Sequence, residues 1–314
     1  MRYSEVVDVV NKVFEEYEIK LTVRQIYYRL ISPPYQLFAN TMNNYKQFDK
    51  ILTKARERGD VDWERIEDRA RAIIGGDYGW NNPDDYLNYK IEDLKNCDSD
   101  YTRAMWDNQL QYVEVWVEKD ALATLFSNAV RGFRVVTFPS RGYSSFTKVM
   151  EAIKDRFLDR IQKGQQIIIL HFSDHDPSGL DMGKDLLNRL KDYLKTKIDE
   201  LSDDLVFVDK FNSERPFFQI FRVALTFDQV KEFNLAPNPT KSADPRAKDY
   251  VAQYGDQCWE LDAVPPDRLP DIIKRAVQKF IEAPKWNEIV QTTEKERQTL
   301  KEKLAKLKIS FGEE

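Results

Sequence analysis

Hydrophobic and polar positions alternate regularly along the second half of this 314-residue chain. Short apolar runs, typical of buried strands, are separated by segments whose apolar residues recur every three or four positions, as on an amphipathic helix. The predicted strands are residues 112–117, 134–138, 166–172, 205–208 and 221–225, and the predicted helices are residues 121–130, 145–157 and 180–194. This alternation predicts an α/β fold with a largely parallel sheet.

The first 74 residues show helical patterns only. Thr22 and Gln25 have the spacing of a capping box, which predicts that a helix begins there. A later helix should begin near Asn43 and stop at Gly59, because glycine readily adopts the left-handed conformation of a helix end. The lysines of this later helix fall on one face, four residues apart: Lys46, Lys50 and Lys54. Three short helices with a basic third helix indicate a helix-turn-helix or winged-helix DNA-binding unit, with a small solvated helical bundle as the alternative.

These patterns divide the chain into four parts. Residues 1–74 form the winged-helix-like domain, and residues 75–109, which are rich in Gly, Asn, Asp and Pro, form a linker. Residues 110–286 form the α/β domain with an extension, and residues 287–314 form a charged C-terminal helix.

Composition narrows the class of protein. The chain is 42% hydrophobic and 32% charged, which is normal for a protein that buries a core. No apolar run approaches the ~20 residues that span a bilayer, and the N-terminus lacks an apolar signal core, so we expect a cytoplasmic protein outside the membrane. Cys97 and Cys258 lie far apart, which argues against a disulfide framework or a zinc cluster. The net charge of −5 argues weakly against a nucleic-acid partner, but basic residues gather in residues 46–71.

Acidic residues follow two of the predicted strands. Glu118 comes after strand 112–117, and Asp174 and Asp176 come after strand 166–172. Because ligand sites in open α/β sheets form at the carboxyl ends of the strands, the three carboxylates should converge if the two strands are neighbours. Such a cluster suits Mg²⁺, which prefers hard oxygen ligands. The alternative is that the two aspartates only cap the following helix.

Two adjacent tyrosines lie on the helix that begins after Thr22. Tyr27 belongs to the apolar stripe of this helix and is predicted to be buried. Tyr28 lies about 100° further round, and Arg24 lies one turn earlier on the same face. An exposed tyrosine beside a cation is suited to act as a nucleophile, because the arginine would hold a phosphate and favour the phenolate. The alternative is an ordinary amphipathic helix with a half-buried tyrosine.

The segments VEKDAL, at residues 117–122, and DHDPSG, at residues 174–179, resemble the Toprim domain shared by topoisomerases, primases and several nucleases. The resemblance implies a Rossmann-like domain with a largely parallel sheet. It also implies that Glu118 serves as an acid/base or metal ligand, and that Asp174 and Asp176 bind Mg²⁺ or Mn²⁺.

The order of the motifs, R-x-I-Y-Y followed by the Toprim segments, resembles the A subunit of type IIB topoisomerases (topoisomerase VI) and the related meiotic double-strand-break protein. The likeness runs from about residue 20 to residue 280 and is closest to small prokaryotic and phage proteins of the topoisomerase VI A-like group. It implies that Tyr28 attacks DNA and that Arg24 helps to position the phosphate. It also implies a homodimer in which the tyrosine of one protomer meets the metal site of the other.

We therefore expect metal-dependent cleavage of double-stranded DNA by tyrosine transesterification, in a cytoplasmic, nucleoid-associated protein. One alternative is hydrolysis by metal-activated water without a covalent adduct, and another is a DNA-binding protein without catalysis. The topoisomerase subunit docks its ATPase partner through an extension ahead of the tyrosine, which is largely missing here. The chain also has no G-x-x-x-x-G-K-[ST] loop. Strand passage would thus need a separate ATPase subunit.

DNA contacts are expected from basic residues in several segments: Lys46, Lys50, Lys54, Arg141, Lys241 and Arg246. For Lys241 and Arg246, a local loop salt-bridged through Asp244 is an equal alternative. Glu260 and Asp262 are predicted to have structural roles, with an extension of the metal site as the alternative.

Overall fold

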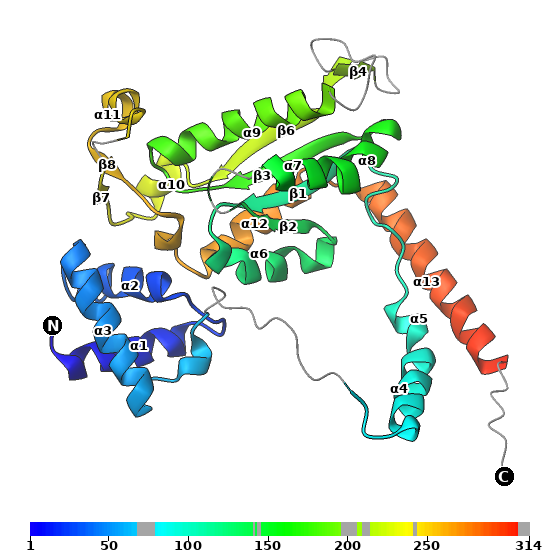
Figure 1. Ribbon diagram of the computed structural model, residues 1–314, viewed down its shortest axis with the longest axis horizontal. Helices are drawn as coiled ribbons and strands as arrows, with labels where there is room; N and C mark the ends of the chain where they lie inside the picture. Colours follow the sequence, from blue (N-terminus) through cyan, green and yellow to red (C-terminus); the bar gives the residue numbers. More distant parts are fainter. Residues whose placement is uncertain are drawn as a thin grey trace. The chain divides into compact units, whose positions relative to one another are not determined.

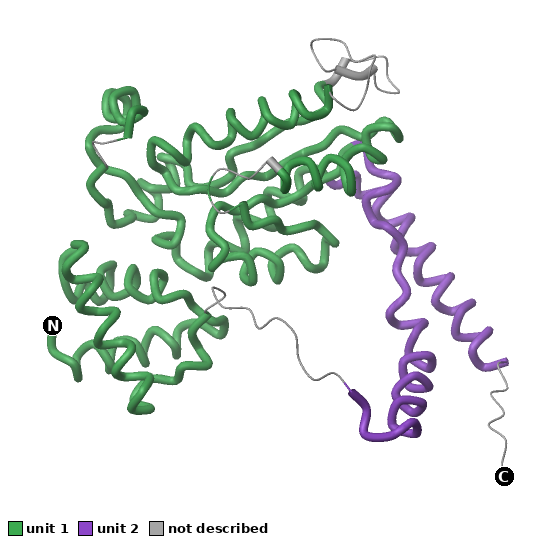
Figure 2. The backbone as a smooth tube through the Cα atoms, in the orientation of Figure 1, with its two compact units in different colours: residues 1–71, 111–280 green, residues 72–110, 281–314 purple. Residues whose placement is uncertain are grey.

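The computed structural model describes residues 1–67, 79–140, 142, 146–195, 206–208, 214–240 and 244–306. The chain forms two compact units, which Figure 2 shows in separate colours. Unit 1 comprises Met1–Arg71 and Gln111–Phe280, and unit 2 comprises Ala72–Leu110 and Ile281–Glu314.

Unit 1 contains a four-stranded parallel sheet in the order β2-β1-β3-β6 (Figure 1). Its strands are β1 (Gln111–Val117), β2 (Val136–Pro139), β3 (Gln166–Phe172) and β6 (Phe218–Ala224). All seven residues of β3 are buried. A strand that is covered on both faces is expected to be apolar throughout, as the run Ile167–Leu170 is. The α/β fold with a parallel sheet is therefore confirmed.

Helices cover both faces of this sheet. The helices of one face are α6 (Ala123–Val130) and α12 (Arg268–Gln278), which contact each other. The helices of the other face are α7 (Phe146–Ala152), α8 (Leu158–Gln162) and α9 (Pro177–Lys195). Two short pairs of strands lie outside the sheet: β4 (Val206–Val208) with β5 (Glu214–Pro216), and β7 (Asn238–Pro239) with β8 (Gln257–Cys258). The remaining helices of this region are α10 (Phe227–Glu232) and α11 (Ala247–Tyr254).

Two predicted elements differ from the structure. Residues 205–208 were predicted as a further strand of an α/β sheet, but Val206–Val208 pairs only with β5, in an antiparallel ladder. Residues 145–157 were predicted as one regular helix, but the turn Ile153–Phe157 is π-helical and leads into α8. Ile153 and Phe157 are both fully buried, so the wider turn places two apolar side chains in the core.

Three helices form the N-terminal part of unit 1: α1 (Tyr3–Glu16), α2 (Val23–Ile31) and α3 (Met42–Arg58). The predicted capping box is present, since the Thr22 side chain accepts from the Gln25 backbone N–H and the Gln25 side chain accepts from the Thr22 N–H. Helix α3 ends at Gly59, which has a φ of 76°. These local signals thus fixed the helix ends correctly.

Unit 2 is helical in its described part. Its helices are α4 (Pro83–Lys95), α5 (Cys97–Asp100) and α13 (Ala283–Lys306). The segment predicted as a linker therefore contains α4 and α5, because Asn82 caps a helix that has proline at its first position. The rings of Trp106 and Trp286 meet edge to face at 5.5 Å. Among the described residues, no helix has the length and apolar character needed to span a membrane.

A buried carboxylate links β1 to the helical layer beside it. Glu114 is fully buried and accepts hydrogen bonds from Arg156 (Nε, 2.6 Å), Trp116 (Nε1, 2.9 Å) and Tyr112 (Oη, 3.1 Å). Arg156 lies in the π-helical turn, which places its guanidinium beside the strand. Charge and hydrogen bonds together compensate for taking this carboxylate out of water.

Substitution of Arg156 by Met should lower the free energy of unfolding by about 3–5 kcal/mol, because it leaves Glu114 charged, buried and unpaired. The matched control is Lys163→Met, which removes an exposed ion pair with Asp159 and should cost less than about 1 kcal/mol. Urea unfolding of both variants measures the difference. Equal costs would show that the Glu114–Arg156 pair adds nothing to stability.

Candidate functional site

The acidic site forms where β1 and β3 end side by side. The register pairs Val117 with Phe172, and the Glu118 N–H donates to the Phe172 carbonyl at 2.8 Å. Directly beyond this pair, the Asp174 N–H donates to Glu118 Oε2 at 3.2 Å. Parallel neighbours end at the same edge of a sheet, so the strand order brings Glu118 next to the Asp174–Asp176 loop.

Each aspartate of this loop also has a structural contact. Asp176 Oδ1 accepts from the Gly179 N–H at 2.6 Å and from Ser178 Oγ at 3.3 Å, as a cap at the start of α9 does. Asp174 Oδ1 accepts from the Leu261 N–H at 2.7 Å. The helix-capping alternative therefore accounts for the contacts of one oxygen of Asp176. Asp174 instead accepts a hydrogen bond from Leu261, which is distant in the sequence.

Two residues set the shape of the loop. A Cβ on Gly179 would lie 2.2 Å from the Asp174 carbonyl oxygen, so only glycine fits there. The Arg222 guanidinium donates to the carbonyls of Asp174 (2.6 Å) and Gly179 (2.7 Å) and to Ser173 Oγ (2.8 Å). Burial lowers the pKa of Arg222 to about 10, against the opposing effect of Asp176 and Asp174, so it stays charged at neutral pH. Arg222 therefore fixes the backbone that carries both aspartates.

Lys119 lies at the centre of the acidic groups. Its Nζ is 2.6 Å from Asp262 Oδ2, 3.0 Å from Glu260 Oε2 and 3.2 Å from Asp174 Oδ1. Burial by itself lowers the pKa of Lys119, and the carboxylates, Asp262 first, outweigh it, so the pKa is raised well above its ordinary value. Sequence reasoning did not select Lys119, although its position directly after Glu118 at a strand end was a signal for it.

Glu260 and Asp262 join this cluster to the N-terminal helices. Glu260 Oε1 is 3.1 Å from Arg24 Nη1, and Asp262 Oδ1 accepts from Thr22 Oγ1 at 3.2 Å. Glu260 directly precedes the short 3₁₀ turn Leu261–Ala263, and Asp262 lies within it. This turn packs against α2. Both residues therefore contact the N-terminal helices and also border the acidic site.

The carboxylates are held in a site with excess negative charge. Burial raises the pKa of Asp174 to about 7, and Glu118 and Glu260 add to the increase while Lys119 opposes it. Burial also raises the pKa of Glu118, partly offset by the hydrogen bond from the Asp174 backbone. A bound cation would favour the ionised forms of both groups.

Three carboxylate oxygens of this site are without a hydrogen bond from the described residues. Among the described residues, Glu118 Oε1, Asp174 Oδ2 and Asp176 Oδ2 accept no hydrogen bond. Mg²⁺ usually takes one or two carboxylates and keeps several waters. Within the same described residues, no three acidic, histidine or cysteine side chains are grouped to enclose a metal.

Tyr28 is placed differently from the prediction. Tyr27 is buried as expected, but Tyr28 is also fully buried, so the expectation of an exposed tyrosine is wrong. The reason is tertiary, because the 3₁₀ turn Leu261–Ala263 packs on α2 and Asn238 Nδ2 donates to the Tyr28 hydroxyl at 2.7 Å. Burial raises the pKa of Tyr28 and Glu260 raises it further, which disfavours the phenolate.

The basic residues predicted to contact DNA fall into three groups. Lys46, Lys50 and Lys54 are exposed on α3. Arg246 pairs with Asp244 (Nε–Oδ1, 2.9 Å) and with Asp181 (Nη1–Oδ2, 3.4 Å), which are the contacts expected of a salt-bridged loop. Two of the predicted residues, Arg141 and Lys241, lie outside the described residues.

Comparison with known proteins adds no relative. No model of a protein family matches the chain, and a search of curated proteins finds no match either.

Substitution of Gly179 by Ala should lower the free energy of unfolding by about 1–3 kcal/mol, because the new methyl group forces the Asp174 carbonyl to move. Gly183→Ala in the same helix is the control, since its Cβ would meet only Ile220 at 4.0 Å, and it should be neutral or stabilising by up to about 1 kcal/mol. Thermal unfolding compares the two. A tolerated Gly179→Ala would mean that the loop is loosely held.

His171 should make the folded protein less stable as the pH drops from about 6.5 to about 4, whereas the raised pKa of Asp174 acts in the opposite direction. His171 is buried beside Arg222, and burial lowers its pKa to about 4 in the folded protein. Between that value and the ordinary pKa of ~6.5, the unfolded chain binds a proton that the folded chain does not. His171→Leu should therefore remove this contribution and change the slope of the unfolding free energy against pH by up to about 1.4 kcal/mol per pH unit in this range. Parallel curves for wild type and variant would rule this out.

Proposed function

We propose that this protein cleaves DNA phosphodiesters in a metal-dependent reaction at the edge formed by Glu118, Asp174 and Asp176. The observation that carries the proposal is the convergence of Glu118 with the Asp174–Asp176 loop at the carboxyl ends of two adjacent parallel strands. A Toprim domain for the sheet, a winged-helix-like domain for the N-terminal helices and a homodimer that binds both DNA strands belong to the same proposal. The resemblance of the two acidic segments and the R-x-I-Y-Y helix supports it.

The chain's own residues would prepare the site in three ways. One or two of the carboxylates would hold Mg²⁺ or Mn²⁺, which when bound stabilises negative charge on phosphate oxygens. Glu118, with a raised pKa, is suited to exchange a proton with a reacting oxygen. Arg222 holds the loop backbone, so that the carboxylate oxygens keep their positions when substrate binds.

Tyr28 is the proposed nucleophile. Its phenolic oxygen would form a bond to phosphorus while the bond from phosphorus to the sugar oxygen breaks. The leaving sugar oxygen would gain a proton to balance the one that the phenol loses, and the protein would become linked to one DNA end. Tyr28 is close enough to Glu260 and Lys119 for their charges to act on its pKa, which supports a role at this same edge. For the reaction, the hydrogen bond from Asn238 must break and the hydroxyl must lose its proton.

Hydrolysis is the second candidate. The observation that favours it is the complete burial and raised pKa of Tyr28, whereas Glu118, Asp174 and Asp176 are each partly exposed to water. In this reaction, the oxygen of water would bond to phosphorus, the sugar oxygen would leave with a proton, and no covalent adduct would form.

DNA would be held partly by α3. Lys46, Lys50 and Lys54 follow one another at every fourth position, which aligns three exposed ammonium groups along the helix. Such a row suits the regular spacing of phosphates on one strand, and its binding would weaken as salt concentration increases.

Plasmid cleavage in Mg²⁺ or Mn²⁺, stopped with detergent and analysed with and without protease, tests the proposal. Wild type should give protein-linked DNA ends, and Glu118→Gln should reduce cleavage by at least about 100-fold, since an acid–base group contributes 10²–10⁴ in rate. Tyr28→Phe should abolish the linked product. The matched control is Tyr27→Phe, which removes the neighbouring hydroxyl and its bond to the Thr41 carbonyl.

Each outcome has a definite meaning. If wild type and Tyr28→Phe produce free ends equally, the reaction is hydrolysis at the same metal site and not transesterification. Cleavage that survives Glu118→Gln, or no cleavage by wild type with either metal and any DNA form, would overturn the proposal.

A further inference from the structure

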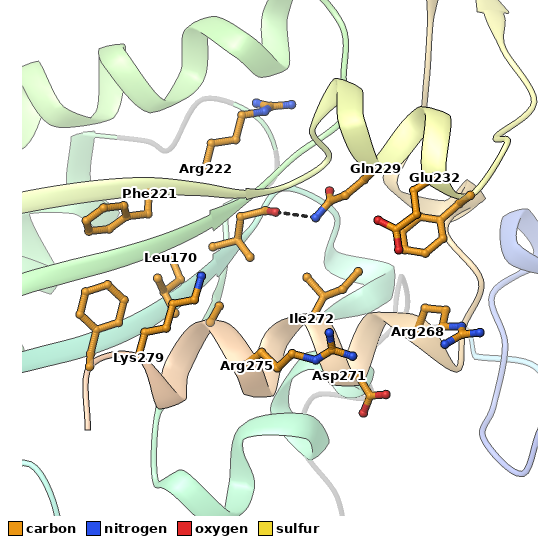
Figure 3. Close-up of a pocket in the computed structure, with 14 residues that line it drawn as sticks. Leu170, Phe221, Arg222, Gln229, Glu232, Arg268, Asp271, Ile272, Arg275 and Lys279 are labelled. Carbon is orange, nitrogen blue, oxygen red and sulfur yellow. Dashed lines mark hydrogen bonds between the residues drawn. The ribbon is translucent and has the colours of Figure 1, made fainter. Parts of the chain in front are cut away.

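A cavity of about 470 Å³ lies in unit 1, between the edge strand β6 and helix α12 (Figure 3). Phe221, Arg222 and Val223 all line this cavity, but side chains alternate along β6, and the guanidinium of Arg222 points away from Phe221 and binds the Asp174 loop (Figure 3). The cavity is thus separate from the acidic edge. Its size falls within the range of small-molecule sites, about 300–1,000 Å³.

One end of the cavity offers an aromatic surface. The rings of Phe221 and Phe280 lie 5.4 Å apart, and 38% of Phe221 is exposed although it belongs to the central sheet. A large apolar side chain on a strand is normally covered by a neighbouring layer, so an uncovered ring beside a second ring is a surface on which a planar group can stack.

Cations lie beside this aromatic surface. Arg275 lies on α12, and Lys279 directly follows the last residue of this helix in a helical backbone conformation. The two residues are therefore one turn apart, and both line the cavity. Neither residue has an ion pair within the described part of the chain. Arg268, which also lines the cavity, has an ion pair with its neighbour Asp267. In Figure 3, Lys279 lies at the same end as Phe221, and Arg275 lies between Lys279 and Asp271 along the helix.

The opposite end carries hydrogen-bond acceptors. Glu232 comes from α10 and Asp271 from α12, and Figure 3 shows Glu232 on the far side of the cavity from Phe221. The Gln229 side chain donates to the Val223 carbonyl at 3.0 Å, so this main-chain oxygen of β6 already has a hydrogen bond. The carboxylates can therefore accept from a hydroxyl or amino group of a bound molecule.

We propose that this cavity binds a nucleotide unit, with the base stacked on Phe221 beside the tilted ring of Phe280 and the phosphate between Arg275 and Lys279. The planar base matches the aromatic surface, and the phosphate dianion matches the cations. The sugar hydroxyls or amino groups match the carboxylates. The unit could be a free nucleotide or the phosphorylated end of a DNA strand, which present the same chemistry. The inference is independent of the proposed cleavage reaction, because no residue of the acidic edge is used.

Isothermal titration calorimetry in EDTA tests the site with the full chain, so that no metal at the acidic edge contributes. The probes are dAMP, deoxyadenosine, inorganic phosphate and a 5′-phosphorylated oligonucleotide. The nucleotide should bind more tightly than either of its parts. Arg275→Glu with Lys279→Glu should weaken binding about tenfold or more, and Phe221→Ala should weaken it by several-fold.

The matched control is Lys274→Glu, an exposed lysine of the same helix that does not line this cavity. It should leave the affinity unchanged, and far-UV circular dichroism checks that each variant is folded. Binding of the oligonucleotide but not of dAMP, lost in the Arg275/Lys279 variant, would identify a DNA end as the source of the unit. Absence of binding to all phosphorylated probes, phosphate as tight as dAMP, or equal affinities in the cavity variants and the control would overturn the proposal.

Discussion

The ammonium group of Lys119 holds the candidate site together. It is within 3.2 Å of three carboxylates from two places in the chain: Asp174 after β3, and Glu260 and Asp262 at the 3₁₀ turn that packs on α2. Taking several carboxylates out of water is costly unless opposite charge and hydrogen bonds compensate. Because Glu260 also pairs with Arg24 and Asp262 with Thr22, the same ammonium connects the sheet edge to the N-terminal helices. The acidic edge and the tyrosine helix therefore depend on a common set of charges.

The loop that carries the two aspartates shows how tightly the site is built. Arg222 reaches from β6 to the loop carbonyls, and Gly179 lets the first turn of α9 approach the Asp174 carbonyl closely. Asp174 and Glu118 are consequently held near each other, and burial raises the pKa of both groups. A site of this kind gains from a cation, which lowers the electrostatic cost of keeping both carboxylates ionised. This is the physical link between the fold and the proposed metal-dependent reaction.

Local sequence rules predicted much of the secondary structure. The apolar run at residues 166–172 became β3 with the same bounds, the capping box at Thr22 began α2, and Gly59 ended α3. These features depend on neighbouring residues and on general chain geometry. The π-helical turn at Ile153–Phe157 could not be predicted in this way, because its wider geometry is favoured by the burial of two side chains in a core assembled from distant strands.

For the candidate site, the sequence by itself determined that Glu118 and Asp174 each follow a buried strand, and hence that they would meet if those strands were neighbours. Only the tertiary structure decided that β1 and β3 are neighbours, that Lys119 lies among the acids, and that Tyr28 is covered. Helical periodicity fixes the direction of Tyr28 on its own helix, but it contains no information about which distant segment packs there. Asn238 and the turn Leu261–Ala263 cover that flank from more than 200 residues away along the chain. Long-range packing, and not local pattern, therefore sets the exposure and the pKa of the proposed nucleophile.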